Sequence, residues 1–161
     1  MLRAMMSRRR LIALATLGSI GLFGGALAFQ YFGGLAPCHL CLWQRWPHRI
    51  AIALGAMALL VPSVVAQRAL SFAGALTMVW SVGIGIYHTG VEQKWWLSTC
   101  SSESIAGVKT DDLLNQIMNA PVVHCDQIAW SMWGLSMASW NALISAGLVA
   151  VWLMAAFRPN R

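Results

Sequence analysis

The sequence predicts an all-α membrane protein, a bundle of four transmembrane helices with two outward loops, formed by 1–161 as a single domain. Of 161 residues, 58% are apolar and only 10% are charged, whereas an ordinary soluble domain carries roughly 25% charged residues. The net charge of +6 does not indicate nucleic-acid binding, because the basic residues flank apolar segments instead of lining one polar face. The composition therefore favours a lipid bilayer as the solvent.

Four uncharged segments are long enough to cross a bilayer core, which takes about 20 apolar residues in a helix. The first begins after the arginines at 8–10 and continues past the small residues at 26–28, so we expect an uncleaved helix and not a cleaved signal peptide. The stretch 128–139 mixes tryptophan and serine with apolar residues, which is typical of a membrane interface. The predicted spans are 11–32, 50–66, 69–87 and 140–157.

The distribution of arginine predicts which side of the membrane each end faces. The positive-inside rule places both termini and a short turn at Gln67-Arg68 in the cytoplasm. The loops 33–49 and 88–139 then face outward, into the periplasm if this is a bacterial inner membrane. The arginines on the cytoplasmic side, which no acidic residue accompanies, are Arg3, Arg8, Arg9, Arg10, Arg68, Arg158 and Arg161.

The second outward loop contains one predicted helix. Two acidic residues, Asp111 and Asp112, precede apolar residues at helical spacing, and acidic residues are favoured in the first turn of a helix. We expect a short helix that lies on the membrane surface. Its apolar residues are Leu113, Leu114, Ile117 and Met118.

All four cysteines fall in the outward loops. Cys38 and Cys41 form a Cys-x-x-Cys motif in the first loop, and Cys100 and Cys125 lie in the second. An outward loop of a bacterial membrane faces an oxidising compartment, where thiols pair, and four cysteines allow three connectivities. A Cys-x-x-Cys disulfide closes almost no loop and so stabilises little, but such motifs often have a lowered thiol pKa. The spacing favours a redox-active pair.

The residues around the motif favour a thiolate. If a helix begins near Pro37, its N-terminus stabilises negative charge on the thiols. Arg45 follows Cys41 by four residues, so on a helix both lie on one face. Pro47 is expected to kink a continuous helix from Cys38 unless the helix begins there.

A metal site is the main alternative, and it corresponds to a non-enzymatic metal-binding or structural four-helix protein. The spacing argues against zinc, because the second candidate pair is adjacent and Cys100 is left over. Covalent haem is excluded, because a histidine must follow Cys41 and the chain has Leu42. The zinc-type residues are Cys38, His39, Cys41, His124 and Cys125.

A dithiol that is oxidised repeatedly needs an electron acceptor. The sequence has neither the glycine fingerprint of dinucleotide-binding folds nor a phosphate-binding loop, so we expect a lipid-soluble acceptor, a quinone. Arg45 can polarise a quinone carbonyl beside Cys41. His88, at the outer end of the third predicted span, can hydrogen-bond the same ring.

The chain resembles the disulfide bond formation protein B (DsbB) family over nearly its whole length. The resemblance is carried by residues 37–45, Pro-Cys-His-Leu-Cys-Leu-Trp-Gln-Arg, by Tyr87-His88, by Cys100 with Cys125, and by the four predicted spans. It implies an oxidoreductase of the bacterial inner membrane. A vitamin K epoxide reductase-like enzyme is a rival, but there the quinone-linked Cys-x-x-Cys usually comes late in the chain.

The resemblance implies a relay across two disulfides. A reduced periplasmic, DsbA-like thioredoxin-fold protein attacks Cys100 of a Cys100–Cys125 disulfide, and the freed Cys125 exchanges with a Cys38–Cys41 disulfide at Cys38. Cys41, as a thiolate beside Arg45, then passes electrons to ubiquinone or menaquinone. Each exchange is a thiolate attack through a mixed disulfide. The residue at the position of His88 lies near the quinone in this family.

Overall fold

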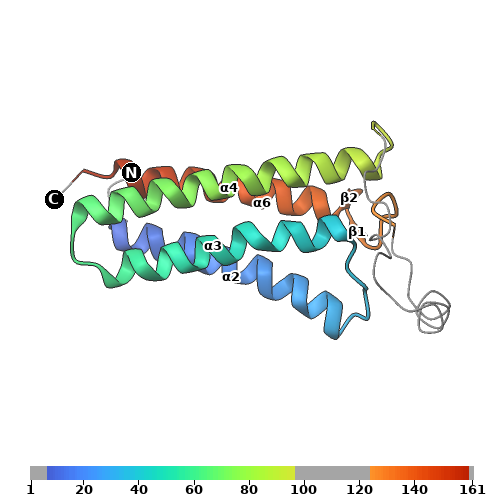
Figure 1. Ribbon diagram of the computed structural model, residues 1–161, viewed down its shortest axis with the longest axis horizontal. Coiled ribbons are helices and arrows are strands. Elements are labelled where there is room, and N and C mark those ends of the chain that lie inside the picture. The colour runs from blue at the N-terminus through green and yellow to red at the C-terminus, as the bar shows by residue number, and fades with distance from the viewer. Residues whose placement is uncertain (1–6, 97–123, 160–161) are drawn as a thin grey trace, which may run out of the picture.

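The computed structural model describes residues 7–96 and 124–159. Four long helices run along one axis (Figure 1), and a two-stranded hairpin precedes the last of them. The predicted surface helix at 111–118 lies outside the described residues. The elements are α2 (Arg8–Tyr31), α3 (His39–Leu60), α4 (Val64–Glu92), β1 (Ser131–Met132), β2 (Leu135–Ser136) and α6 (Met137–Phe157).

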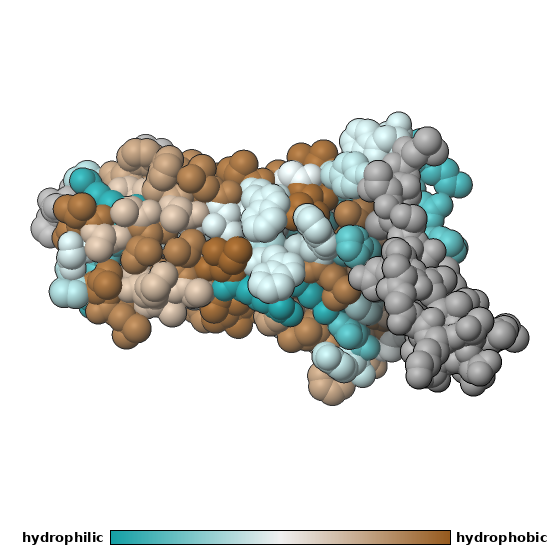
Figure 2. Space-filling view, in the orientation of Figure 1, coloured by the Kyte–Doolittle hydropathy of each residue, from teal (hydrophilic) through white to brown (hydrophobic). Residues whose placement is uncertain are grey.

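Three of the helices, α2, α4 and α6, are long and apolar enough to cross a membrane. On the face shown in Figure 2, apolar residues cover much of the bundle between its two ends, as expected for a surface that contacts lipid. The prediction of a helical, multi-pass membrane protein is thereby confirmed. The helix α3 has 22 residues, but polar residues lie in its first half, among them Gln44, Arg45 and His48.

The helices pack through small residues. The helix α4 packs against α6 and α3, and α2 packs against α3 and α6. A Cβ atom on Gly74 of α4 would lie 2.8 Å from the ring of Trp152, which is fully buried in α6. Small residues let helices approach closely, which is the main source of packing energy where lipid removes the hydrophobic driving force.

The helix α3 begins at His39, so much of the predicted first outward loop is helical. Cys38 is the N-cap residue of this helix. Pro47 lies inside α3 and is fully buried, and the helix continues past it to Leu60. Proline removes one backbone hydrogen bond, but helices packed in a membrane bundle accommodate it.

The predicted turn at Gln67-Arg68 is wrong by about one helical turn. The helix α3 ends with Val61 as its C-cap, and Ser63 is the N-cap of α4. Gln67 lies within the first turns of α4, where its side chain donates a hydrogen bond to the Val61 carbonyl at 3.0 Å. Proline at position 62 and serine at 63 are common at helix boundaries, and here they outweigh the charge that marked the predicted turn.

A β-hairpin occupies part of 128–139, where the sequence indicated only an interfacial approach. The strands β1 and β2 pair antiparallel through a two-residue turn at Trp133 and Gly134, with φ of 54° and 79°. Positive φ at both turn residues is the geometry that suits a tight hairpin. Ser136 then caps α6 by accepting a hydrogen bond from the Ser139 amide at 3.2 Å.

Candidate active site

The Cys-x-x-Cys motif forms the N-terminus of α3. The Sγ atom of Cys38 accepts a hydrogen bond from the backbone amide of Cys41 at 3.2 Å, and the two Sγ atoms are 2.8 Å apart. Both cysteines are free thiols, and Cys38 is buried. The expectation that a helix begins beside Pro37 and carries the thiols is therefore met in the structure.

The two thiols differ in acidity. The hydrogen bond to Cys41 and burial raise the pKa of Cys38. The hydrogen bond from Cys38 lowers the pKa of Cys41, and the charge of Arg45 adds a smaller effect in the same direction. Of the two thiols, Cys41 is therefore the one whose thiolate form is favoured.

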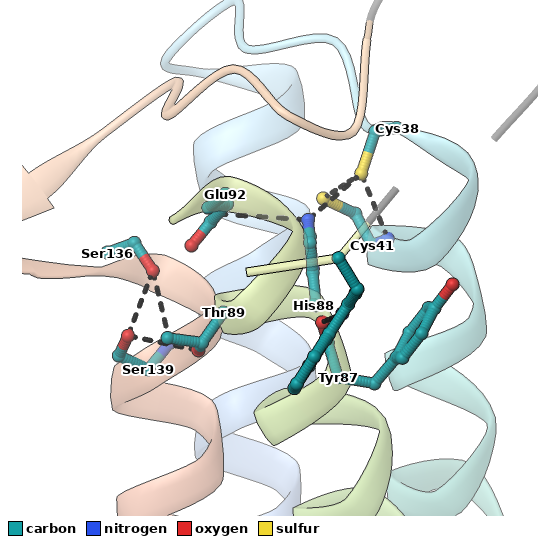
Figure 3. A network of polar contacts seen from close by, with 9 residues as sticks. Cys38, Cys41, Tyr87, His88, Thr89, Glu92, Ser136 and Ser139 are labelled. Atoms are coloured by element: carbon teal, nitrogen blue, oxygen red, sulfur yellow. Dashed lines mark hydrogen bonds and ion pairs between the residues drawn. The ribbon is translucent and has the colours of Figure 1, made fainter. Parts of the chain in front are cut away.

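His88 and Glu92 are one turn apart near the end of α4, and Figure 3 shows His88 below the thiols with Glu92 beside it. The Nε2 atom of His88 lies 3.6 Å from the Sγ atom of Cys38 and 3.8 Å from Oε1 of Glu92. Both side chains are buried. A histidine at this distance can exchange a proton with the thiol of Cys38.

The same geometry bears on metal binding. The sulfurs of Cys38 and Cys41 and a ring nitrogen of His88 lie within 4.8 Å of one another, a set that could hold a metal ion. Of the other zinc-type residues, His39 and His124 are exposed. The ring of His39 lies against Trp43, with centroids 5.8 Å apart.

The third described cysteine, Cys125, lies beside the motif. It is disulfide-bonded and 1% exposed, and it belongs to one buried cluster with Cys38, Leu40 and Val91. Cys100 lies outside the described residues. The fold thus brings Cys125, which is distant in sequence, to the redox pair at the start of α3.

Arg45 lies on the face of α3 that carries Cys41, but its hydrogen bonds go to α2. Its Nη1 donates to Oε1 of Gln30 at 2.6 Å, and its Nη2 donates to the carbonyl of Ala26 at 3.4 Å. The side chain is 8% exposed, and its Nε has no partner among the described residues. The predicted pairing with the Cys41 thiolate is thus a through-space effect and not a hydrogen bond.

A cavity of about 440 Å³ opens beside the motif, a size typical of small-molecule sites. Its lining is mostly apolar and comes from all four helices and from the hairpin segment. Five polar lining residues have a buried atom with no hydrogen-bond partner in the described structure. These atoms are Nε2 of Gln44, Nε of Arg45, Nδ1 of His48, Nδ1 of His88 and Oε2 of Glu92.

Sequence reasoning named Cys41, Arg45 and His88, which all line the cavity, but it did not identify Gln44 or His48 as site residues. A signal was available, because polar side chains within a membrane-embedded helix commonly mark a functional site. Both residues fall in the predicted outward loop 33–49, so they were not expected inside the bundle. The continuous helix from His39 places them inside the bundle.

Comparison with known proteins gives the family. A family model described as disulfide bond formation protein DsbB matches residues 8–155. Disulfide bond formation protein B of Polaromonas sp. is 27% identical over 95% of this chain and 93% of the relative. The proteins of the same name from Dechloromonas aromatica and Acinetobacter baylyi are 29% and 30% identical, covering 90% and 91% of this chain and 90% of each relative.

No solved structure matches the chain at a comparable level of significance. The family model nevertheless covers α2, α3, α4 and nearly all of α6, together with the cysteines of the site. The relatives are named for forming disulfide bonds, an oxidation of thiols that suits a dithiol beside a disulfide-bonded cysteine. This chain is therefore a membrane oxidoreductase that forms disulfides and belongs to the disulfide bond formation protein B family.

Proposed function

We propose that the protein oxidises a DsbA-like periplasmic thioredoxin-fold protein and passes the electrons to membrane quinone, either ubiquinone or menaquinone. The observation that carries this proposal is the position of Cys41. Its sulfur lines an apolar cavity within the bundle and is the more acidic of the two thiols. The disulfide-bonded Cys125 lies in the same buried cluster as Cys38.

The proposed topology has four spans, because the apolar second half of α3 also crosses the membrane beside α2, α4 and α6. Both termini lie in the cytoplasm of a bacterial inner membrane. Its support is a basic cluster at the end of the bundle opposite the thiols. The side chains of Arg8 and Arg68 both donate to the carbonyl of Arg158, and Nε of Arg8 also donates to the carbonyl of Ala155 at 3.1 Å. Arginine gathers on the cytoplasmic side of membrane proteins.

The proposed relay begins with the partner protein. Its thiolate attacks the sulfur of Cys100 in a Cys100–Cys125 disulfide, Cys125 leaves as a thiolate, and the partner's second thiol then displaces Cys100 and leaves oxidised. The Cys125 thiolate next attacks Cys38 of a Cys38–Cys41 disulfide and releases Cys41 as a thiolate. Attack by Cys100 on Cys125 restores the first disulfide and frees Cys38.

The product of that exchange corresponds to the described state, in which Cys38 and Cys41 are thiols and Cys125 is disulfide-bonded. Re-forming the Cys38–Cys41 bond releases two electrons and the proton of Cys38. His88 Nε2, 3.6 Å from that sulfur, is positioned to take the proton.

The cavity fits a quinone. Quinone oxygens accept hydrogen bonds, and Gln44 Nε2 and Arg45 Nε are buried donors without partners among the described residues; both side chains line the cavity. The apolar lining suits the rest of a lipid-soluble ring. When bound, a quinone would supply the two-electron acceptor that oxidation of the dithiol requires.

Anaerobic turnover tests the proposal. The purified protein in detergent is mixed with a reduced DsbA-like protein and a soluble ubiquinone analogue, and quinone absorbance is followed beside a Cys38→Ser control. We expect quinone to disappear one for one with partner disulfide formed, and no reaction in the control. Absence of turnover with stoichiometric zinc in the protein would instead support a metal site at Cys38, Cys41 and His88.

A further inference from the structure

His48 lines the same cavity at a deeper level. It follows Cys41 by seven residues on α3, so it lies on nearly the same helix face, about 10 Å further along the axis. Its side chain is 2% exposed. The relay described above does not use it.

Three helices hold the His48 ring in place. Its Nε2 lies 2.9 Å from Oδ1 of Asn141 in α6 and 3.3 Å from Oγ of Ser81 in α4. Nδ2 of Asn141 donates to Oγ of Ser81 at 3.4 Å, and Ser81 lies 3.1 Å from Oγ of Ser145. Buried polar groups in an apolar bundle cost free energy unless they are paired, so a network of this kind indicates a function.

The network determines which ring nitrogen carries the proton. Oδ1 of Asn141 can only accept a hydrogen bond, so Nε2 of His48 must donate. In a neutral imidazole the other nitrogen then presents a lone pair. Nδ1 of His48 is that nitrogen, and it is buried with no partner in the described residues.

The cavity therefore offers two kinds of polar atom. Gln44 Nε2 and Arg45 Nε are donors, and His48 Nδ1 is an acceptor whose lone pair is fixed by the contact of Nε2 with Asn141. His88 Nδ1 and Glu92 Oε2, beside the thiols, are also without a partner in the described residues. An oxidised quinone has only acceptor oxygens and satisfies the donors alone. A reduced quinone carries hydroxyl groups, which donate as well as accept, and can satisfy both.

We propose that Nδ1 of His48 accepts a hydrogen bond from a hydroxyl of the reduced quinone, so that His48 selectively stabilises the quinol in the cavity. The inference rests on the proposed function for the identity of the ligand. It assigns His48 a role in binding the product, distinct from the electron transfer at Cys41.

Equilibrium binding tests the inference without turnover. A Cys38→Ser/Cys41→Ser chain cannot pass electrons to the ligand, so both a soluble benzoquinone and its hydroquinone can be titrated into it by anaerobic calorimetry. On this background we expect His48→Leu to raise the Kd of the hydroquinone about three- to tenfold, the effect of one lost hydrogen bond. The Kd of the quinone should change less than twofold.

Two further variants separate hydrogen bonding from packing. His48→Asn keeps an acceptor oxygen near the position of Nδ1, and we expect it to retain most of the hydroquinone affinity. Ser71→Ala is the matched control, because Ser71 is fully buried in α4 and donates only to the Gln67 carbonyl of its own helix, at 2.7 Å. This variant should leave both Kd values unchanged.

A measurement on the Cys38→Ser/Cys41→Ser chain with native His48 avoids any effect of the His48 substitutions on folding. In ¹⁵N-histidine-labelled protein, the Nδ1 resonance of His48 should shift on adding hydroquinone and not on adding quinone. Equal weakening of both ligands in His48→Leu, or no hydroquinone-specific shift, overturns the inference. If the native chain turns over but His48 gives no preference for hydroquinone over quinone, the proposed function stands and the inference fails. If the preference is found but the native chain does not turn over, only the proposed function is overturned.

Discussion

At the scale of single residues, the site depends on two sulfurs of the same type that the fold makes chemically different. Cys38 caps α3 from a buried position, and Cys41 receives its hydrogen bond. The difference in acidity between the thiols therefore arises mainly from their mutual hydrogen bond, and only secondarily from the arginine that the sequence suggested.

This asymmetry predicts how alkylation depends on pH. Because the pKa of Cys41 is lowered, its thiolate persists below the ordinary thiol range, and iodoacetamide should modify Cys41 before Cys38. Cys38→Ala removes the donor, so the pH midpoint of Cys41 alkylation should rise. Cys38→Ser keeps an O–H donor and should give a smaller rise. Mass spectrometry of reduced protein across a pH series measures this, and equal midpoints for the two variants would argue against the hydrogen bond as the cause.

Substitutions of Arg45 and of Cys41 should impair the reaction in different ways. Cys41→Ser should abolish turnover, because no thiolate remains to donate electrons. Arg45→Ala removes a buried donor at the cavity and the contacts with Gln30 and Ala26, so it should raise the KM for quinone more than the KM for the protein substrate. Steady-state kinetics with each substrate varied in turn decides this, and equal changes in both constants would count against Arg45 as a quinone ligand.

At the scale of elements, local sequence signals were reliable for the existence of helices and weak for their ends. Long apolar runs predicted every long helix that the structure describes, because burial in lipid requires such runs. The turn before α4 differed from expectation, and α3 begins at His39, near Pro37 and before the predicted span 50–66. Charge was used to locate the turn and the start of that span, whereas capping by Ser63 and Cys38 determines where the two helices begin.

Packing of α4 against α6 gives a prediction at this scale. A methyl group on Gly74 would meet the rigid, buried ring of Trp152, so Gly74→Ala should destabilise the bundle by about 1–3 kcal/mol. Gly83 lies in the same helix with open space at its Cβ position, and Gly83→Ala is the matched control. Thermal unfolding in detergent should show a lower Tm for Gly74→Ala only, and a similar loss in both variants would mean that helix backbone effects dominate.

At the scale of the whole molecule, the bundle separates two chemical ends. The thiols, His88 and the hairpin lie at one end, and Arg8, Arg68 and Arg158 meet at the other. Alkaline phosphatase, which is active only outside the cytoplasm, should therefore be active when fused after Lys94 and inactive when fused after Arg158. The opposite pattern would reverse the proposed orientation.

The sequence alone determined that the chain lies in a lipid bilayer, that it folds as a helical bundle and that it carries a redox-active cysteine pair. Composition, apolar run length and the two-residue cysteine spacing are local properties, so a membrane bundle with a redox motif and its family could be inferred from them. Only the tertiary structure decided what each side chain faces. It brought Cys125 to Cys38, turned Arg45 toward α2 and joined His48 to Asn141 at the cavity. These partners lie far apart along the chain and meet only because four helices pack together.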